Sequence, residues 1–570
     1  MEEKAANRLP FLFNPDLRRA GQPKAESPTK SDQSVKSDKS VVQTIPYAAT
    51  GAFSGLVLDY IKQAPALAEF YHRRPTLAAF AEQLSEKQAA FDAASRQRLV
   101  TALRDQYAAL PEVPAAVQAN LNMLARDTTF TVTTGHQLAL FTGPLYFIYK
   151  IISAIRLCRD LKAEYPENDF VPVFWLASED HDFAEVNHFY LFGKKYEWHA
   201  ERTGGPVGRL PLDGLDEQVL SHLLAEVPAA FLAAYRESAT LGEATFKLAN
   251  ALFGEHGLVC LDADRADLKQ ALVPVLEREI QAQASNHAVQ ATNARLEKAG
   301  YKPQVYSRPL NLFFITETGQ RERLEPDITG ADCVQITVRG TGQCHTQAEL
   351  LALARQHPEQ FSPNVVLRPV YQELLLPNLC YIGGGAEVAY WGQLKAVFEA
   401  NQVPFPIVLL RNSALYLSRA NAGKLRKLGF ETLDIFKPLP ELKKQVGASL
   451  GQEEISLAEQ QARLKAAFDE VATLAQRLDP TLVKAVAAEA QKAAAAVAGL
   501  EKRLSKAAET KHETAYAQLS GLKDKLFPDG GLQERTDNVL SILLNNPAFF
   551  EQLLAAFEPL ALDFTVLEEA

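Results

Sequence analysis

Residues 131–150 read TVTTGHQLALFTGPLYFIYK and set the fold class of the chain. The first residues are rich in β-branched side chains and predict a strand, which breaks at Gly135 and leads into a helix. A helix that follows a strand turns free backbone N–H groups toward the turn, where a phosphate or carboxylate is favoured. The glycine spacing matches neither GxGxxG nor GxxxxGK[ST]. The stretch therefore predicts an α/β ligand site without naming its ligand.

Strand-like and helical segments alternate beyond this stretch. Apolar strand-like runs follow at 171–177, 258–262, 311–316 and 406–412. Helical periodicity separates several of them, as at 144–163 and 265–298. This alternation is typical of a parallel, doubly wound sheet. We therefore predict an α/β protein.

The 570 residues divide into segments of different composition. A Ser-, Lys- and Asp-rich stretch at 21–40 has too little apolar surface to offset its ordering entropy, and we expect a flexible tail there. Apolar positions at steps of three and four predict coiled-coil helices over 441–526, long enough for a dimer interface or for an arm over the site. The expected segments are a tail at 1–44, a core at 45–440 with a helical segment at 64–126 and insertions at about 200–255 and 280–362, the coiled coil at 441–526, and a return to the core at 527–570.

Composition excludes several classes of protein. The net charge of −10 gives no long-range attraction for nucleic acid. The longest apolar runs are far shorter than the roughly 20 residues of a membrane-spanning helix. The five cysteines lack CxxC spacing and are expected to be reduced thiols. We expect a cytoplasmic protein that binds neither nucleic acid nor a membrane.

A polar cluster, SEDHDFAEVNH at 178–188, follows the strand-like run VPVFWLA. Ligands of open α/β sheets bind at the carboxyl ends of strands, and this is such an end. A general base with carboxylates that orient an ammonium group or a divalent cation would explain the composition. The alternative is that Asp180 or Asp182 only caps a helix. A zinc site is a weaker hypothesis, because the spacing of His181 and His188 matches no common zinc signature.

Two further strand ends carry candidate ligand groups. In YIGGGAEVAYWGQLK, at 381–395, three glycines permit close backbone approach to a ligand, and Glu387, Tyr390 and Trp391 follow. The alternative for Trp391 is a place in the core. In LRNS, at 410–413, Arg411 could neutralise a phosphate or carboxylate, unless it is a surface arginine.

Together with the late LQER at 532–535, these motifs resemble the cysteine ligase family of bacillithiol biosynthesis over about residues 45–570. The resemblance implies a Rossmann-like core with connecting insertions and a coiled-coil domain that forms a homodimer. It implies ligation of L-cysteine to glucosaminyl-malate. ATP is the usual source of activation for such a reaction, with ADP or AMP as the nucleotide product and Mg²⁺ as a candidate cofactor. Members of the family often have Gln where this chain has His136.

The resemblance and the clusters together give the candidate site. In this hypothesis the TGHQ turn holds a phosphate or carboxylate and His136 donates to the transition state. His181 or Asp180 accepts the amine proton, and Arg411 faces the malate. The candidate catalytic residues are His136, Asp180 and His181; the candidate substrate-binding residues are Thr134, Gly135, Gln137, Tyr149, Glu179, Asp182, Gly384, Gly385, Glu387, Tyr390, Trp391, Arg411, Asn412 and Ser413. No metal ligand is assigned. The competing hypothesis is a non-catalytic partner that binds a nucleotide or a sugar-malate for another enzyme.

Overall fold

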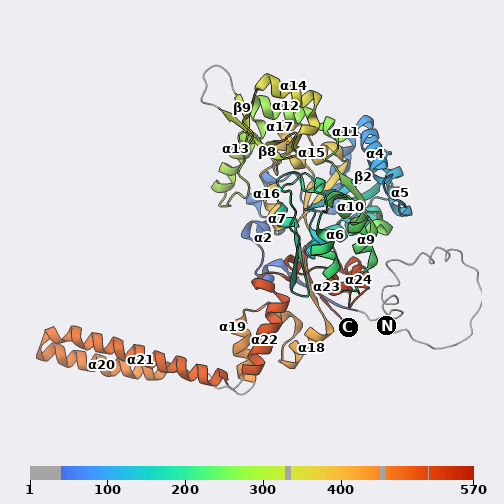
Figure 1. Ribbon diagram of the computed structural model, residues 1–570. Helices are drawn as coiled ribbons and strands as arrows, with labels where there is room; N and C mark the ends of the chain where they lie inside the picture. The colour runs from blue at the N-terminus through green and yellow to red at the C-terminus, as the bar shows by residue number, and fades with distance from the viewer. Residues whose placement is uncertain (1–39, 328–334, 450–455, 511–512, 570) are drawn as a thin grey trace, which may run out of the picture. The chain divides into compact units, whose positions relative to one another are not determined.

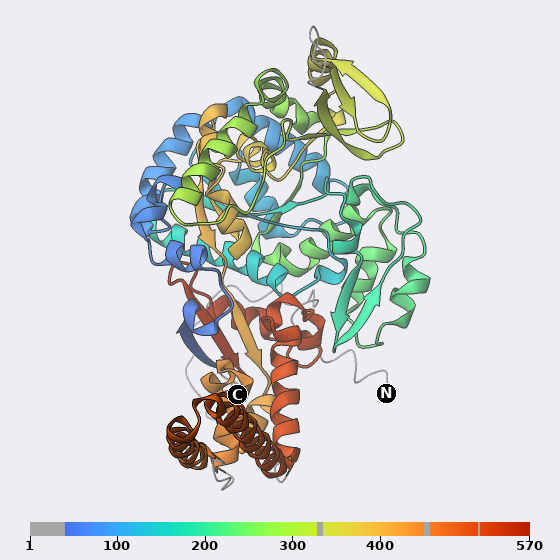
Figure 2. The ribbon, with the colours of Figure 1, turned by 90° about the vertical axis from the view of Figure 1, so that its left-hand side faces the viewer.

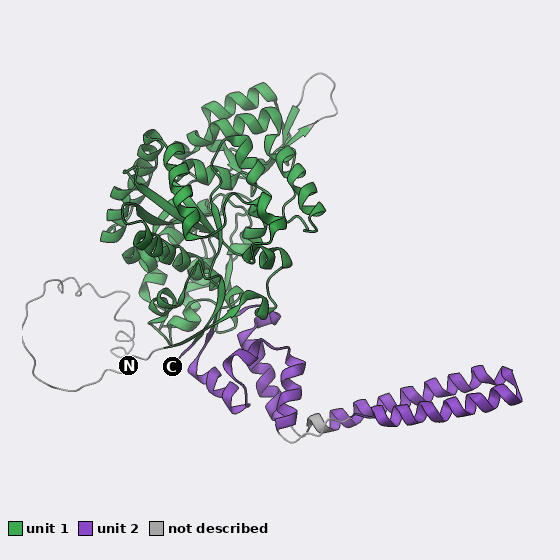
Figure 3. Cartoon of the chain, turned by 180° about the vertical axis from the view of Figure 1, so that it is seen from behind, with its two compact units in different colours: residues 1–415, 533–567 green, residues 416–532, 568–570 purple. Residues whose placement is uncertain are grey.

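The computed structural model describes residues 40–327, 335–449, 456–510 and 513–569. The chain forms two compact units, coloured separately in Figure 3. Unit 1 comprises Met1–Leu415 and Gln533–Leu567, and unit 2 comprises Tyr416–Leu532 and Glu568–Ala570. Residues 1–39 of the expected tail lie outside the described residues, whereas strand β1 (Val41–Pro46) begins inside the range expected to be tail.

A five-stranded parallel sheet forms the core of unit 1, which confirms the predicted α/β fold. Its order is β13-β12-β2-β3-β6. The strands are β2 (Thr129–His136), β3 (Asp169–Leu176), β6 (Val259–Asp262), β12 (Asn378–Gly383) and β13 (Ile407–Leu410). The chain starts in the middle at β2, moves outward to β6 and then returns to the other side of β2. The strand order therefore reverses between β2 and β12, and such a point is where open α/β sheets bind ligands.

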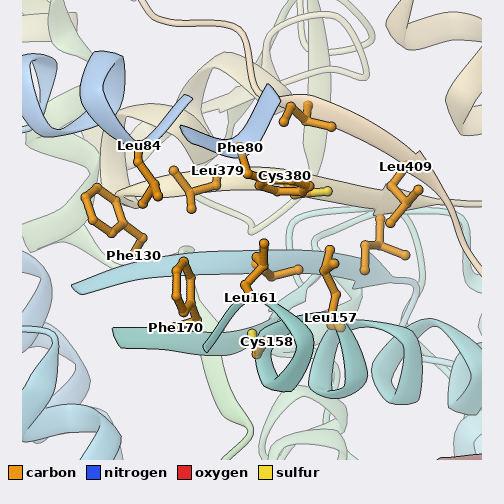
Figure 4. Close-up of a cluster of buried hydrophobic side chains, with 14 residues drawn as sticks. Phe80, Leu84, Phe130, Leu157, Cys158, Leu161, Phe170, Leu379, Cys380 and Leu409 are labelled. Atoms are coloured by element: carbon orange, nitrogen blue, oxygen red, sulfur yellow. The ribbon is translucent and has the colours of Figure 1, made fainter. Parts of the chain in front are cut away.

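Helices bury the apolar face of the sheet. Figure 4 shows side chains of α3 (Leu77–Ala90) and α6 (Tyr146–Glu164) meeting those of β2 and β12 in one cluster. Phe80, Leu157 and Phe130 in this cluster have no exposed surface. Each such side chain contributes about 1.5–3 kcal/mol by leaving water, which orders the sheet beneath the site. The helical segment expected at 64–126 contains α3, α4 (Ala93–Tyr107) and α5 (Ala115–Met123).

The two expected insertions differ in structure. The first holds α9 (Ala229–Arg236) and α10 (Leu241–Phe253), and the hairpin of β4 (His188–Leu191) and β5 (Lys194–Glu197) precedes it. The second contains α12 (Val273–Ala282), α13 (Ala284–Lys298), α14 (Gln347–Gln356) and a separate antiparallel sheet, yellow-green in Figure 2, of order β10-β9-β8-β7-β11. Its strands are β7 (Leu312–Ile315), β8 (Arg321–Asp327), β9 (Gln335–Val338), β10 (Gln343–Thr346) and β11 (Phe361–Pro363). The strand-like run at 311–316 thus lies outside the parallel core, because a short apolar run does not reveal which sheet it joins.

Several further helices and strands follow the core strands or form a small separate sheet. Helix α15 (Arg368–Leu375) precedes β12, and α16 (Gly385–Trp391) and α17 (Lys395–Asn401) lie between β12 and β13. A three-stranded sheet has the order β1-β15-β14, with β14 (Ala414–Leu417) and β15 (Asp563–Glu568). Helices α23 (Leu540–Leu543) and α24 (Phe549–Ala556) belong to the C-terminal part of unit 1.

Unit 2 is helical and confirms the predicted coiled coil. It contains α18 (Arg419–Lys427), α19 (Leu439–Ser449), α20 (Ala458–Leu478), α21 (Val483–Thr510) and α22 (Glu513–Leu526). Helices α20 and α21 lie side by side as a hairpin (Figure 1), and Gln461 on one donates to Glu501 on the other at 3.1 Å. At the bend, Asp479 accepts the backbone N–H of Thr481 at 2.9 Å. None of the described helices has the length and apolar character needed to cross a membrane.

Candidate functional site

A cavity of about 870 Å³ lies at the carboxyl ends of the core strands of unit 1. Gly135 at the end of β2, Ala177 after β3 and Gly384 after β12 contribute to its floor. The antiparallel sheet of the second insertion and the start of α15 form further walls. We call this the strand-end cavity. It lies at the reversal of strand order, where the sheet topology favours ligand binding.

The strand-end cavity brings together most of the sequence-predicted residues. Those that line it are Gly135, His136, Gln137, Glu179, Asp180, His181, Gly384, Gly385, Glu387, Tyr390 and Arg411. Thr134, Tyr149, Asp182, Trp391, Asn412 and Ser413 are not among its lining residues.

Three of the residues outside the cavity wall are buried in the core. Tyr149 on α6 has no exposed surface and packs edge-on against Phe557. Trp391 stacks on Tyr381, with ring centroids 4.4 Å apart. Thr134 donates its hydroxyl to the carbonyl of a residue on β12 at 2.8 Å. All three side chains are thus buried outside the cavity wall, and the Tyr149 hydroxyl has no hydrogen-bond partner in the part of the chain that the structure describes.

The other three outlying residues accept hydrogen bonds within the protein. Asp182 accepts the backbone N–H of Glu185 at 3.3 Å and caps α7 (Phe183–Val186), as the capping alternative predicted. Asn412 accepts the Ser153 hydroxyl at 3.1 Å. Ser413 accepts a hydrogen bond from the Arg411 guanidinium at 2.8 Å.

His136 is held as a neutral acceptor. Its Nδ1 lies 2.7 Å from the carbonyl oxygen of Gln137, so Nδ1 carries the proton and donates, and Nε2 keeps its lone pair. The rings of Tyr146 and Phe147 lie against it, with centroids 5.0 and 5.2 Å away. Burial, helped by the positive charge of Lys150, lowers the pKa of His136 to about 3. The predicted donation by His136 to the transition state needs a second proton on the ring, at Nε2, and this low pKa disfavours that proton near neutral pH.

Asp180 is held as a carboxylate. It accepts the backbone N–H of His181 at 2.7 Å and a short hydrogen bond from the Gln137 amide. Burial alone would raise the pKa of Asp180, but the His181 side chain, the Gln137 amide and the Arg321 guanidinium outweigh burial and hold it well below its usual range. An aspartate of such low pKa attracts a cation well and accepts a proton poorly.

His181 is tied to the second insertion. The guanidinium of Arg321 on β8 lies 2.8 Å from His181 Nδ1. A guanidinium has only donors, so this contact makes Nδ1 the acceptor and leaves the imidazole proton on Nε2. Arg321 itself is anchored by the hydroxyl of Ser362 at 2.9 Å and by the ring of Phe313 at 3.8 Å. Nε2 of His181 can therefore donate a hydrogen bond, while its basic nitrogen is already engaged.

Two carboxylates of the cavity are neutralised by lysines. Lys150 on α6 pairs with Glu387 and also donates to the carbonyl of Gly135 at 2.8 Å. Burial would raise the pKa of Glu387, but Lys150 outweighs it and the pKa is lowered. Lys269 pairs with Glu179, and there burial prevails and raises the pKa of Glu179. Both ion pairs connect segments that are distant in the sequence and that line the cavity.

Arg411 is also neutralised from within the chain. Its guanidinium lies 2.8 Å from the Glu534 carboxylate, and both side chains are almost fully buried. Glu534 in addition accepts the backbone N–H of Ala414 at 3.0 Å. The structure thus gives the LQER motif a role that its residue types did not reveal, and it gives the Arg411 charge an internal counter-ion. Arg411 still lines the cavity, and its expected contact with the malate stays a prediction.

Two family models cover nearly all of the described chain. Residues 41–412 match "Bacillithiol biosynthesis BshC, N-terminal Rossmann-like domain", and residues 414–569 match "Bacillithiol biosynthesis BshC, C-terminal coiled-coil domain". The chain belongs to the BshC family. This confirms the resemblance inferred from the motifs.

BshC relatives match this chain over almost their full length. A protein of Flavobacterium johnsoniae is 40% identical over 534 residues, which cover 92% of this chain and 99% of the relative. Proteins of Christiangramia forsetii and Cytophaga hutchinsonii are each 39% identical and cover 92% and 91% of this chain and 98% and 97% of their own. All three are named "Putative cysteine ligase BshC".

The site of this BshC chain also contains residues that sequence reasoning missed. They are Glu185, Arg308, Arg321, Arg323, Arg368 and Arg535, all of which line the cavity. Glu185 stood inside a quoted motif, and Arg535 ends LQER, so both could have been singled out. The other four lie in or beside the second insertion, in which the sequence motifs assigned no site. Within the described ranges, no group of three or more His, Cys, Asp or Glu is arranged to hold a metal ion.

Proposed function

We propose that this protein is a cysteine ligase that forms the amide between L-cysteine and glucosaminyl-malate, the last step of bacillithiol biosynthesis. Membership of the BshC family and the names of its relatives support the reaction class. The single observation that carries the proposal is the strand-end cavity, which presents carboxylates and arginines to one space. Cysteine and glucosaminyl-malate each carry an amine and at least one carboxylate, so a site for either substrate needs both acidic and basic side chains.

The acidic wall suits the amines. Asp180 stays charged, and Glu185 on α7 lines the same cavity. Burial, reinforced by Asp180 and Asp182, raises the pKa of Glu185. In the proposed reaction Asp180 holds an ammonium group, and Glu185 accepts the proton that the amine must lose before it attacks the activated carboxyl carbon. The Nε2 proton of His181 is free to hydrogen-bond the carboxyl oxygen of the substrate.

The activation step requires ATP in this proposal, because a carboxylate oxygen is a poor leaving group. The oxygen leaves with a phosphorus group of the nucleotide, and ADP with phosphate or AMP with pyrophosphate is the by-product. Mg²⁺ would enter with the nucleotide, whose phosphates are its usual ligands. His136, as a neutral acceptor at the end of β2, would receive a hydrogen bond from a substrate hydroxyl or amine.

The coiled coil suggests a homodimer. Leu474, Leu478 and Leu482 near the bend of the α20–α21 hairpin are 45%, 72% and 50% exposed, and Leu500 and Leu504 are 53% and 47% exposed. Leucines at helical spacing are favoured in the seam between helices and are poorly placed in water. We propose that a second copy of the hairpin covers them, in a protein that works in the cytoplasm.

The decisive experiment supplies the purified protein with L-cysteine, glucosaminyl-malate and ATP, and follows bacillithiol, ADP and AMP by mass spectrometry. We expect Asp180→Asn to lower turnover at least about 100-fold. Asp216→Asn is the matched control, because it makes the same change of side chain at an exposed carboxylate that pairs with Arg236 at 2.7 Å outside the cavity. Saturable binding of all three substrates without any amide product would refute the ligase and support a non-catalytic partner.

A further inference from the structure

The positive charge of the strand-end cavity is unevenly compensated. Lys150 and Arg411 have their own carboxylates, and Arg321 lies 4.0 Å from Asp180. In the part of the chain that the structure describes, the side chains of Arg323 and Arg368 form no ion pair, although both line the cavity. Among the described residues, Arg308 and Arg535 also line the cavity without forming an ion pair, but both residues are exposed, whereas Arg323 on β8 and Arg368 at the start of α15 are only partly exposed.

Arg368 is the best ordered of these groups. Its guanidinium carbon lies 5.8 Å from the ring centre of Trp175 and 5.5 Å from that of Tyr381. Its Nη1 donates to the neutral amide oxygen of Gln372 at 3.1 Å. Its Nη2 is buried and has no hydrogen-bond partner among the described residues. Two aromatic rings and one neutral amide therefore hold the fork in place. The Glu387 carboxylate, whose charge helps raise the pKa of Arg368, is already paired with Lys150.

Such an arrangement is costly unless a ligand completes it. An enclosed guanidinium loses hydration, and neutral partners return only part of that loss. The planar fork offers two parallel N–H groups, which match the two oxygens of a carboxylate or phosphate better than an ammonium does. Aromatic rings on the guanidinium restrict its rotation, so little further entropy is lost when the anion binds. The geometry is that of a preorganised anion site.

We propose that Arg368, together with Arg323 of β8, forms an anion subsite of the strand-end cavity that binds a carboxylate or phosphate group of a substrate. The identity of the substrate rests on the proposed function, whereas the anion chemistry does not. The cavity then has a basic region, formed by this subsite, and an acidic region, formed by Asp180 and Glu185. A ligand that carries an amine and an anion is thereby oriented with its amine toward the end of β3.

Calorimetric titration of the full chain tests the subsite directly. The probes are L-malate, glucosaminyl-malate and ATP, each titrated into wild-type protein and into Arg368→Met. Loss of a charged hydrogen-bond pair weakens binding of the relevant probe about ten- to a hundred-fold. Arg368→Lys keeps the charge but not the fork and should recover only part of the affinity. Arg355→Met is the control, because Arg355 pairs with Glu277 at 2.5 Å on an exposed surface away from the cavity.

The probes separate the two sources of the anion. Weaker binding of malate and glucosaminyl-malate, with ATP unchanged, assigns the subsite to the malate carboxylates; the reverse assigns it to the nucleotide phosphates. If Arg368→Met does not fold, Arg323→Met gives the same test from a half-buried side chain of the second insertion. Unchanged affinity of both folded variants for all three probes overturns the proposal. A protein that binds these anions through Arg368 but makes no amide refutes the ligase and leaves the subsite standing.

Discussion

Replacing His136 by Gln should make the protein more resistant to acid without abolishing its function. The imidazole donates through Nδ1 to the carbonyl of Gln137, which leaves Nε2 as its acceptor nitrogen. A glutamine amide also carries one donor end and one acceptor end, so it offers the same two hydrogen-bonding functions. It cannot take up a proton near neutral pH. The substitution therefore removes one titrating group and preserves a donor and an acceptor at this position.

The size of the effect follows from the pKa of His136, which burial lowers from 6.5 to about 3. The folded state favours the neutral imidazole, so protonation opposes folding. The contribution of His136 to the free energy of unfolding is thus fully present above about pH 6.5 and is lost as the pH falls toward 3. Each pH unit in this window costs about 1.4 kcal/mol, and at pH 5 the wild-type protein should have lost about 2 kcal/mol through His136 alone.

Tryptophan fluorescence during urea unfolding at pH 7 and pH 5 measures this difference. All three tryptophans, Trp175, Trp198 and Trp391, belong to unit 1, so the signal is specific to the unit that contains His136. We expect the stability difference between the two pH values to be about 2 kcal/mol smaller in His136→Gln than in wild type. His357→Gln, a change of an exposed histidine outside the cavity, should behave like wild type. Equal loss of stability in wild type and His136→Gln would refute the argument, and inactivity of a folded His136→Gln would show that the imidazole itself is required.

Further outcomes follow from other contacts. Lys87→Met should destabilise unit 1 by about 3–5 kcal/mol in urea unfolding, because it leaves the Glu373 carboxylate, 2.9 Å away and fully buried, without its counter-ion; a loss below about 1 kcal/mol would contradict this. Arg411→Met should cost a similar amount, since it isolates the buried Glu534, and equal stability to wild type would mean that the pair is not formed in solution. Deletion of residues 458–510 should convert a dimer to a monomer by light scattering, and a persistent dimer would refute the proposed role of the coiled coil.

Much of the fold was predictable because its signals are local. The β-branched run that ends at Gly135, and the alternation that follows, predicted a parallel sheet, and the spacing of apolar residues predicted the coiled coil. Polar clusters directly after strands predicted where His136, Asp180 and Glu387 would meet, since parallel strands end at one edge. The same reasoning failed for Trp391 and Tyr149, because position on a helix near a strand end does not say which face is buried.

The sequence by itself therefore determined the family, the parallel core, the coiled coil and the strand ends that carry the polar clusters. Only the tertiary structure decided which charges remain available to a ligand. Arg411 looked available until Glu534, 123 residues later, proved to pair with it, whereas Arg368 carried no motif and keeps its charge uncompensated. The physical reason is that hydropathy patterns repeat within a few residues along the chain. Ion pairing depends instead on which distant segments the fold brings within a few ångströms.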